Sequence, residues 1–452
     1  MFLSYFLIDR PDRYQINFST FKISDWLTEN NKNQRPDPFN YRNASFQDRY
    51  ALQMLISLGF VFRDKWAQLT DEELNWNKWN VDDRYTFCCY ALEQLRNDHG
   101  YDLTRTARDY NETRKKASKA DVNMDEQAIL VRDIQRLKVA TCTLTPLKII
   151  FQPLEVTTGS RALRNPQFGG AERFLLVHFR DEDNRRLRVS SSNIKHRLKS
   201  AMLNGIELLN KTFKYMGAST GQMKEMGFWF IDLPPSLKDM KAAHDILGKF
   251  DKIKNIATYI ARVGQYFSTT WPVGITLIKV ESKNDIRPNS ELCYVYEEKD
   301  IKRNGINGIE YCFTDGIGKM SWGLAGRVAQ RMNIPLYSKE DIPSAYQIRL
   351  AGCKGMVAID PESTLNDYYI SVRESMMKFP SDDWNLEICE FARPMTLTLN
   401  NQVIRLLSDL KNPDDVFIAF QNRGFTQWEV PEDQQPSAID IAVQKNASYS
   451  LS

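Results

Sequence analysis

Cysteine pairs of the C-x-x-C type are absent from this sequence of 452 residues, in which only Cys88 and Cys89 are neighbours. The seven cysteines are odd in number and never occur with C-x-x-C spacing, which argues against a zinc site built from cysteine pairs. Scattered cysteines with apolar neighbours are typical of proteins from a reducing compartment. We therefore expect free thiols and an intracellular protein.

Long apolar runs are missing as well. No run reaches the ~20 residues that a membrane-spanning helix needs. The first residues, MFLSYFLIDRPDRY, hold a short apolar stretch without a basic segment before it, which is not the pattern of a signal peptide. We expect no membrane partner.

A strong excess of charge of either sign is also lacking. Sixty Lys and Arg face 57 Asp and Glu, a net charge of +3, so bulk charge does not by itself indicate nucleic-acid binding. The length predicts two to four domains.

A complete phosphate loop is absent, although one stretch approaches the pattern. FTDGIGKMS, residues 313–321, places Gly318 before Lys319. A Walker loop needs glycine where Phe313 stands and Ser or Thr where Met320 stands. The stretch therefore argues against a glycine-loop nucleotide hydrolase and favours a glycine turn that leads into a helix capped by Ser321.

The pattern of the chain changes near residue 126. Residues 1–125 read as mainly helical: Ser45 can cap a helix that follows it, and Tyr85, Cys88 and Leu92 recur at helical spacing. The segments TCTLTPLKIIFQPLEV and ERFLLVHF then favour strands.

Further helices and strands are expected in the second half. DKIKNIATYIARVG, residues 251–264, predicts a helix capped by Asp251 with an apolar face of Ile253, Ile256 and Ile260. Residues 272–373 read as strands and turns with a short helix after Ser321. NQVIRLLSDL and PDDVFIAFQ predict two closing helices.

Two lysines stand beside residues that look buried. Lys354 lies in LAGCKG and Lys378 in VRESMMKF, both near the ends of expected strands. Gly352 and Gly355 permit close approach of the backbone around Lys354. Two ammonium groups fixed on one barrel could hold phosphate oxygens. The residues alone leave open a plainer interpretation, in which both side chains extend into solvent.

Several segments together carry a resemblance to a known family. FTDGIGKMS, PSAYQIRLAGCKGMVAIDP and VRESMMKF resemble the first catalytic barrel of the cellular RNA-dependent RNA polymerases of RNA silencing. TPLKIIFQPLEVTTGSRALR and RFLLVHFRDED resemble the segment upstream of that barrel, and FDKIKNIATYIARVGQYFSTT resembles the helix before it. LNNQVIRLLSDLKNPDDVFIAFQ resembles the helices after it, so the resemblance extends from about Thr141 to Gln421.

The resemblance implies an α+β fold with a double-psi β-barrel of the two-barrel RNA polymerase type. We expect a helical N-terminal region over 1–125, a β-rich template or linker region over 126–250, the barrel with flanking helices over 251–430 and a loose tail over 431–452. The family acts on single-stranded RNA templates and nucleoside triphosphates. It uses Mg²⁺ that a D-x-D-G-D triad in the second barrel binds.

The resemblance also assigns roles to individual residues. It implies that Lys354 and Lys378 contact phosphates as catalytic residues and that Arg349 and Arg373 assist them. The turns of the barrel would be shaped by Asp315, Gly316, Gly352 and Gly355. No residue of this chain is expected as a metal ligand.

The sequence departs from the family pattern at one large and one small point. No D-x-D-G-D occurs in the 452 residues, and Glu374 stands where the family usually has proline. We therefore expect the chain to supply the lysine barrel, to need a second-barrel half, and not to polymerise RNA alone. The alternative is a non-catalytic RNA-binding or scaffold protein derived from the family.

The resemblance further implies partners and a location. Helicases, Dicer-type nucleases and Argonaute-type proteins accompany members of the family, which work in the nucleus and the cytoplasm.

Overall fold

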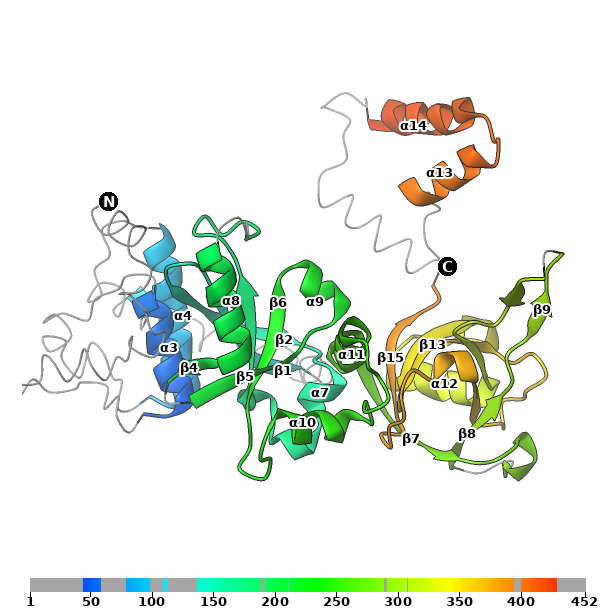
Figure 1. Cartoon of the computed structure of the whole chain (residues 1–452), viewed down its shortest axis with the longest axis horizontal. Coiled ribbons are helices and arrows are strands. Elements are labelled where there is room, and N and C mark those ends of the chain that lie inside the picture. Colours follow the sequence, from blue (N-terminus) through cyan, green and yellow to red (C-terminus); the bar gives the residue numbers. More distant parts are fainter. Residues whose placement is uncertain are drawn as a thin grey trace, which may run out of the picture. The chain divides into compact units, whose positions relative to one another are not determined.

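The computed structural model describes residues 44–57, 79–97, 109–110, 112, 136–187, 192–209, 211–287, 291–306, 308–393 and 400–428. The chain divides into two compact units, residues 1–391 and 392–452. Figure 1 labels the elements along the chain.

A six-stranded sheet with the order β2-β1-β3-β6-β5-β4 forms the first β region. Its strands are β1 (Leu137–Leu144), β2 (Ile149–Thr157), β3 (Phe174–Phe179), β4 (Ile206–Leu208), β5 (Lys211–Gly217) and β6 (Gly227–Asp232). Neighbouring strands are antiparallel except for β1 and β3, which run parallel.

Both faces of this sheet are buried, because apolar residues continue along its central strands. In β3, Leu175 and Val177 point into one apolar cluster, whereas Phe174 and Leu176 point into another. This alternation follows from the two-residue period of a strand. The helices on the two faces are α3 (Phe46–Ser57), α4 (Val81–Asn97) and α8 (Ser192–Asn204) on the first, and α7 (Arg161–Arg164), α10 (Met240–Leu247) and α11 (Ile256–Val263) on the second.

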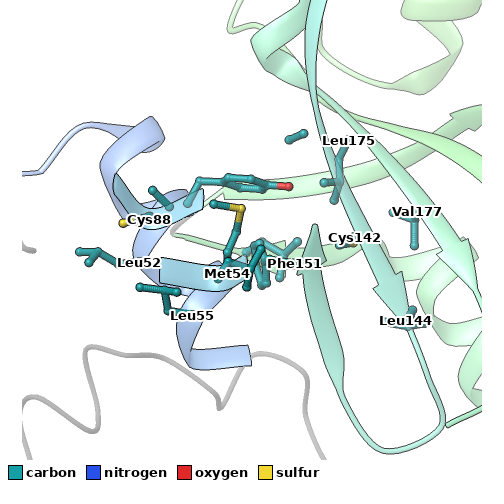
Figure 2. Close-up of a cluster of buried hydrophobic side chains, with 14 of the residues drawn as sticks. Leu52, Met54, Leu55, Cys88, Cys142, Leu144, Phe151, Leu175 and Val177 are labelled. Atoms are coloured by element: carbon teal, nitrogen blue, oxygen red, sulfur yellow. The ribbon is translucent and has the colours of Figure 1, made fainter. Parts of the chain in front are cut away.

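The N-terminal helices pack on the first face, where Figure 2 shows Met54 of α3 beside Phe151 of β2. The expected start of α3 is confirmed, since the Ser45 hydroxyl accepts a hydrogen bond from the Asp48 amide at 3.1 Å. An ion pair of 2.7 Å between Arg84 and Asp48 joins α4 to α3.

Seven strands close into a barrel in the order β11-β13-β12-β15-β7-β8-β14. They are β7 (Trp271–Lys279), β8 (Cys293–Glu298), β11 (Ile317–Met320), β12 (Ala345–Leu350), β13 (Cys353–Ile359), β14 (Tyr369–Arg373) and β15 (Asn385–Phe391). Antiparallel pairing of β11 with β14 completes the closure. The barrel, the sheet and the helices confirm the expected α+β class.

The barrel interior is filled by apolar side chains. Tyr346, Ile348 and Leu350 alternate along β12 and are completely buried beside Val357 of β13. Helix α12 (Trp322–Arg331) adds Leu324 to the same core. This confirms the short helix expected after Ser321. The Ser321 hydroxyl does not cap it, because it donates to the Asp367 carbonyl at 2.7 Å.

Shorter elements connect these parts. They are α9 (Thr220–Lys224), the hairpin strands β9 (Lys302–Asn304) and β10 (Glu310–Cys312), and the 3-10 helices η6 (Pro166–Phe168), η7 (Ala171–Arg173), η8 (Gly264–Phe267), η9 (Lys283–Asp285), η10 (Lys339–Asp341) and η11 (Glu374–Met376).

The helix expected over 251–264 is shorter than predicted. Helix α11 begins at Ile256, and Asn255 caps it by accepting a hydrogen bond from the Thr258 amide at 3.0 Å, so the cap assigned to Asp251 was wrong. The expected apolar face was wrong in part: Ile256 is 75% exposed, and the buried residue is Val263 at the other end. The helix packs through the end where the chain turns into η8.

The second unit holds the two closing helices, which are confirmed as α13 (Asn401–Asp409) and α14 (Asp414–Trp428). Asn400 caps α13 by accepting a hydrogen bond from the Val403 amide at 2.8 Å. The Ser408 hydroxyl joins the two helices through a 2.6 Å hydrogen bond to Asp414.

The cysteines and the helices that the structure describes lack two features that secreted or membrane proteins often have. All seven cysteines are free. In the part of the chain that the structure describes, none of the helices has the length and apolar character needed to cross a membrane.

Candidate functional site

Lys354 lies at the start of β13, in the hairpin that β12 and β13 form. The side chains alternate there, so that Cys353 is buried in the barrel and Lys354 is exposed on the outside. Its cross-strand neighbour on β12 is Arg349. Among the described residues, the Lys354 ammonium has neither a hydrogen-bond acceptor nor an ion-pair partner.

The chain after η11 brings Lys378 beside this hairpin. Met377 pairs with Cys353 in an isolated antiparallel bridge, and the Lys378 amide donates to the Gly352 carbonyl at 3.0 Å. The Lys378 ammonium donates to the Ser375 carbonyl, and its side chain is half-buried. The two lysines that the sequence separates are therefore held on adjacent segments.

Glycine is required at two points of this junction. A Cβ atom on Gly352 would lie 1.6 Å from the Phe379 carbonyl oxygen, and one on Gly355 would lie 2.3 Å from the Gly316 carbonyl oxygen. Both contacts are with backbone, which cannot move aside without breaking the pairing. The glycines around Lys354 thus let three backbone segments meet next to it.

Arg349 is buried, with an exposed fraction of 5%. Its Nη1 donates to the Ile348 carbonyl at 2.9 Å, and its Nε has no partner among the described residues. The carboxylate across from it on β15, Glu387, is bound by Arg164 at 2.5 Å and by the Thr270 hydroxyl. Burial lowers the pKa of Arg349.

The charges around Lys354 are of one sign. Partial desolvation against the strand surface lowers the pKa of the exposed Lys354, and the positive charges of Arg349, Arg262 and Lys378 lower it further. We call Arg262, Arg349, Lys354 and Lys378 the basic cluster. Such a cluster is unfavourable by itself and is stabilised when an anion binds, so it is suited to phosphate.

Sequence reasoning missed Arg262. It lies at the end of α11, far from the other three in sequence, and no local pattern marks it. The available signal was its place in FDKIKNIATYIARVGQYFSTT, one of the segments that carry the family resemblance.

Arg373, Asp315 and Gly316 are not members of the basic cluster, and Arg373 and Gly316 have partners of their own. Arg373 is 6% exposed and forms a 3.1 Å ion pair with Glu298 on β8. Asp315 is exposed in the turn before β11. The Gly316 carbonyl accepts from the Met356 amide at 2.9 Å, and the Gly316 amide donates to the Ser375 hydroxyl at 3.0 Å.

The loop that carries Lys378 is held by a carboxylate. Asp300 accepts hydrogen bonds from the amide and the hydroxyl of Ser375 at 2.9 and 2.8 Å and from the Thr314 hydroxyl at 2.8 Å. Burial alone would raise the pKa of Asp300, but these hydrogen bonds outweigh it and the pKa is lowered.

The basic cluster does not suit Mg²⁺, which prefers several oxygen ligands and would be repelled by four cations. Nearby carboxylates are already engaged, Glu387 by Arg164 and Asp383 by Arg161, both at 2.5 Å. Over the described ranges, no group of three or more His, Cys, Asp or Glu side chains could hold a metal ion.

A family model described as RNA dependent RNA polymerase matches residues 144–450, well over half of the chain. The chain belongs to the RNA-dependent RNA polymerase family. The match confirms the resemblance drawn from the lysine-bearing segments, all of which lie inside it.

Curated RNA-dependent RNA polymerases are similar over the same part of the chain. The probable RNA-dependent RNA polymerase 1 of Oryza sativa subsp. japonica is 32% identical over 308 residues, covering 65% of this chain and 38% of that protein. RNA-dependent RNA polymerase 1 of Arabidopsis thaliana is 32% identical over 286 residues, covering 61% of this chain and 24% of that protein. The chain thus spans well under half the length of these relatives.

A solved structure of an RNA-dependent RNA polymerase is also similar. The polymerase QDE-1 from Thielavia terrestris matches with a TM-score of 0.49 and 17% sequence identity, covering 82% of this chain and 39% of that chain.

Proposed function

We propose that this chain supplies the phosphate-contacting barrel of an RNA-dependent RNA polymerase that makes double-stranded RNA from single-stranded RNA templates in RNA silencing. One observation carries the proposal: the β12–β13 hairpin and the loop after η11 hold Lys354 and Lys378 on adjacent segments. Membership of the family supports the reaction type.

The proposed chemistry follows from charge. Nucleotidyl transfer spreads negative charge over phosphate oxygens in the transition state, and cations that are already in place stabilise it without reorganisation. Lys354, with no partner of its own, is free to donate to such an oxygen. The loop held by Asp300 keeps Lys378 beside it. We propose phosphate-contacting roles for both lysines and a supporting role for Arg349.

Arg373 fits a different proposed role. Its ion pair with Glu298 and its hydrogen bond to the Lys299 carbonyl fix the end of β14 against β8. We propose that it supports the turn around Asp315 and Gly316 and does not itself contact substrate.

The metal chemistry of the family needs ligands from elsewhere. The sequence contains no D-x-D-G-D, and the basic cluster does not suit Mg²⁺. We propose that a second-barrel half bearing the triad completes the site, and that nucleoside triphosphates and the RNA template bind between the two. Partner proteins of the helicase, Dicer or Argonaute type, and a nuclear or cytoplasmic location, belong to the same proposal.

A reconstitution assay tests this function. The purified 452-residue chain is incubated with single-stranded RNA, labelled nucleoside triphosphates and Mg²⁺, alone and with the triad-bearing segment of a relative. We expect synthesis only in the mixture, and a drop of about a hundredfold or more with Lys354→Ala. Arg331→Ala, which removes an exposed arginine of α12, serves as the matched control. Synthesis by the chain alone would contradict the need for a second half.

The second candidate is a non-catalytic RNA-binding or scaffold protein of the same family. The basic cluster allows it, because cations without carboxylate partners suit the phosphates of an RNA strand whether or not synthesis follows. It predicts that Lys354→Ala weakens RNA binding only slightly and that no triad-bearing segment restores synthesis.

A further inference from the structure

Arg262 is the member of the basic cluster that lies outside the barrel strands. It belongs to the last turn of α11, whereas Arg349 and Lys354 belong to the β12–β13 hairpin. The Nε atom of Arg262 is buried and has no hydrogen-bond partner among the described residues. The Nε atom of Arg349 is also buried without a partner among the described residues, and Arg349 as a whole is only 5% exposed.

Packing fixes Arg262 relative to the loop that carries Lys378. The next residue, Val263, is 2% exposed and shares an apolar cluster with Phe379, which directly follows Lys378. The Tyr266 hydroxyl lies 2.7 Å from the Ser381 hydroxyl. Because α11 and the loop share a core, their cationic residues keep a fixed spacing.

The cluster differs from the arginines beside it. Arg161 and Arg164 each bind a carboxylate at 2.5 Å. In contrast, within the part of the chain that the structure describes, none of Arg262, Lys354 or Lys378 is paired with a carboxylate. Buried polar atoms normally have partners, and like charges repel unless an anion lies between them. The open donors therefore point to an anionic ligand.

We propose that Arg262 binds a phosphate group adjacent to the one that Lys354 contacts, so that the site spans two successive phosphates. The inference rests on the proposed function and adds to it a residue and the length of the ligand. Two phosphates in a row occur in an RNA strand and in a nucleoside triphosphate, and both present the same chemistry to a guanidinium.

Binding by the full 452-residue chain tests the proposal. Fluorescence anisotropy measures the affinity for a labelled single-stranded oligouridylate at several salt concentrations, and unlabelled tripolyphosphate serves as competitor. Arg262→Ala is compared with Arg262→Lys, Lys354→Ala and the control Arg331→Ala, whose arginine is exposed and unpaired among the described residues.

We expect Arg262→Ala to weaken binding about tenfold and to reduce the slope of log affinity against log salt by about 0.7. Arg262→Lys should keep the slope because it keeps the charge, and Arg331→Ala should match the wild type. If Arg262→Ala alters oligouridylate binding alone, the phosphates are those of RNA; if it alters tripolyphosphate competition as well, they include those of a triphosphate.

Three results would overturn the inference. Unchanged affinity and slope in Arg262→Ala, with loss in Lys354→Ala, would remove Arg262 from the site and leave the proposed function standing. An absence of salt-dependent binding by the wild type would remove both. A large fall in melting temperature of both Arg262→Ala and Arg262→Lys would show a structural role; relief of repulsion predicts an unchanged or higher melting temperature instead.

Discussion

Lys354, the proposed phosphate contact, occupies a position that is unfavourable in the free chain. It lies on a rigid strand end between Cys353, which is buried, and Gly355, which allows the Gly316 backbone to approach. A solvated lysine needs neither neighbour. Fixed placement without a partner costs stability in the free chain, and in the role proposed for Lys354 it prepares the ammonium for a phosphate.

The lowered pKa of Lys354 predicts a pH dependence of phosphate binding. As pH rises through this pKa, the ammonium loses its proton earlier than an ordinary lysine does, so tripolyphosphate affinity should fall. Calorimetric titration between pH 7 and 10 measures it. Lys354→Arg keeps its positive charge over this range and should remove this part of the pH dependence. Identical pH profiles for the wild type and Lys354→Arg would contradict a phosphate contact by Lys354.

The same shift has a consequence for folding. A lysine whose pKa is lower in the folded than in the unfolded chain binds its proton more tightly when unfolded, so stability rises with pH between the two values. Below that range the charged Lys354 opposes folding. Lys354→Met should therefore raise the melting temperature at pH 7 without ligand, and a decrease would contradict this.

At the scale of elements, a bulge in the first sheet depends on a residue from a helix. The pairing of β1 with β2 shifts register between Val139 and Thr141. The Tyr50 hydroxyl of α3 accepts from the Thr141 amide at 2.9 Å and reaches the Thr141 and Gln152 carbonyls at 2.7 and 2.6 Å. It thus bonds backbone groups of both β1 and β2 beside the register shift.

Removing that hydroxyl should destabilise the chain. Tyr50→Phe removes the hydrogen bonds of this buried hydroxyl to the backbone of β1 and β2, which should cost about 1–3 kcal/mol in the free energy of unfolding. Urea denaturation measures the loss. Tyr337→Phe is the control, because Tyr337 is 92% exposed and should change nothing; equal stability of both variants would show that water replaces the hydroxyl.

Asp300 holds the loop that carries Lys378 in place through its hydrogen bonds to Ser375. Asp300→Asn weakens its hydrogen bonds to Ser375 and should lower the free energy of unfolding at pH 7 by about 1–2 kcal/mol. Because the pKa of Asp300 is lowered, its contribution is present above the unfolded pKa and is lost as pH falls through the folded one.

The control for this prediction is Asp382→Asn, which changes an exposed carboxylate. Urea titrations at pH 7 and pH 3 are compared. We expect the two variants to differ in stability at pH 7 and the difference to become smaller at pH 3. A constant difference at both pH values would rule out the carboxylate as the source.

At the scale of the whole first unit, α7 joins the sheet to the barrel. Arg161 binds Asp383 and donates to the Ala351 carbonyl at 2.9 Å, beside the Lys354 hairpin. Arg164 binds Glu387 on β15. Ion pairs with little exposure link the two β regions and hold the hairpin turn.

Breaking this link should uncouple the two regions. Arg161→Met leaves Asp383 without its partner and should cost about 3–5 kcal/mol. We expect barrel and sheet, followed by separate probes during urea unfolding, to melt together in the wild type and apart in the variant. Lys241→Met, which removes an exposed pair with Asp245, should keep one transition. A single transition in Arg161→Met would contradict the coupling.

The sequence by itself determined the local elements and the family. Ser45 marked the start of α3, TCTLTPLKIIFQPLEV and ERFLLVHF indicated strands, and the glycines around Lys354 indicated a close backbone approach. These features depend on neighbours a few residues away, so periodicity and turn residues reveal them.

Only the tertiary structure decided which charges meet. Asn255 displaced Asp251 as a cap, Ile256 turned out exposed, and Arg262 joined the basic cluster from a separate helix. Arg373, in contrast, forms an ion pair with Glu298. Whether a cation binds a carboxylate or stays open for a phosphate depends on contacts between distant segments, which the closure of the barrel and the packing of α11 create.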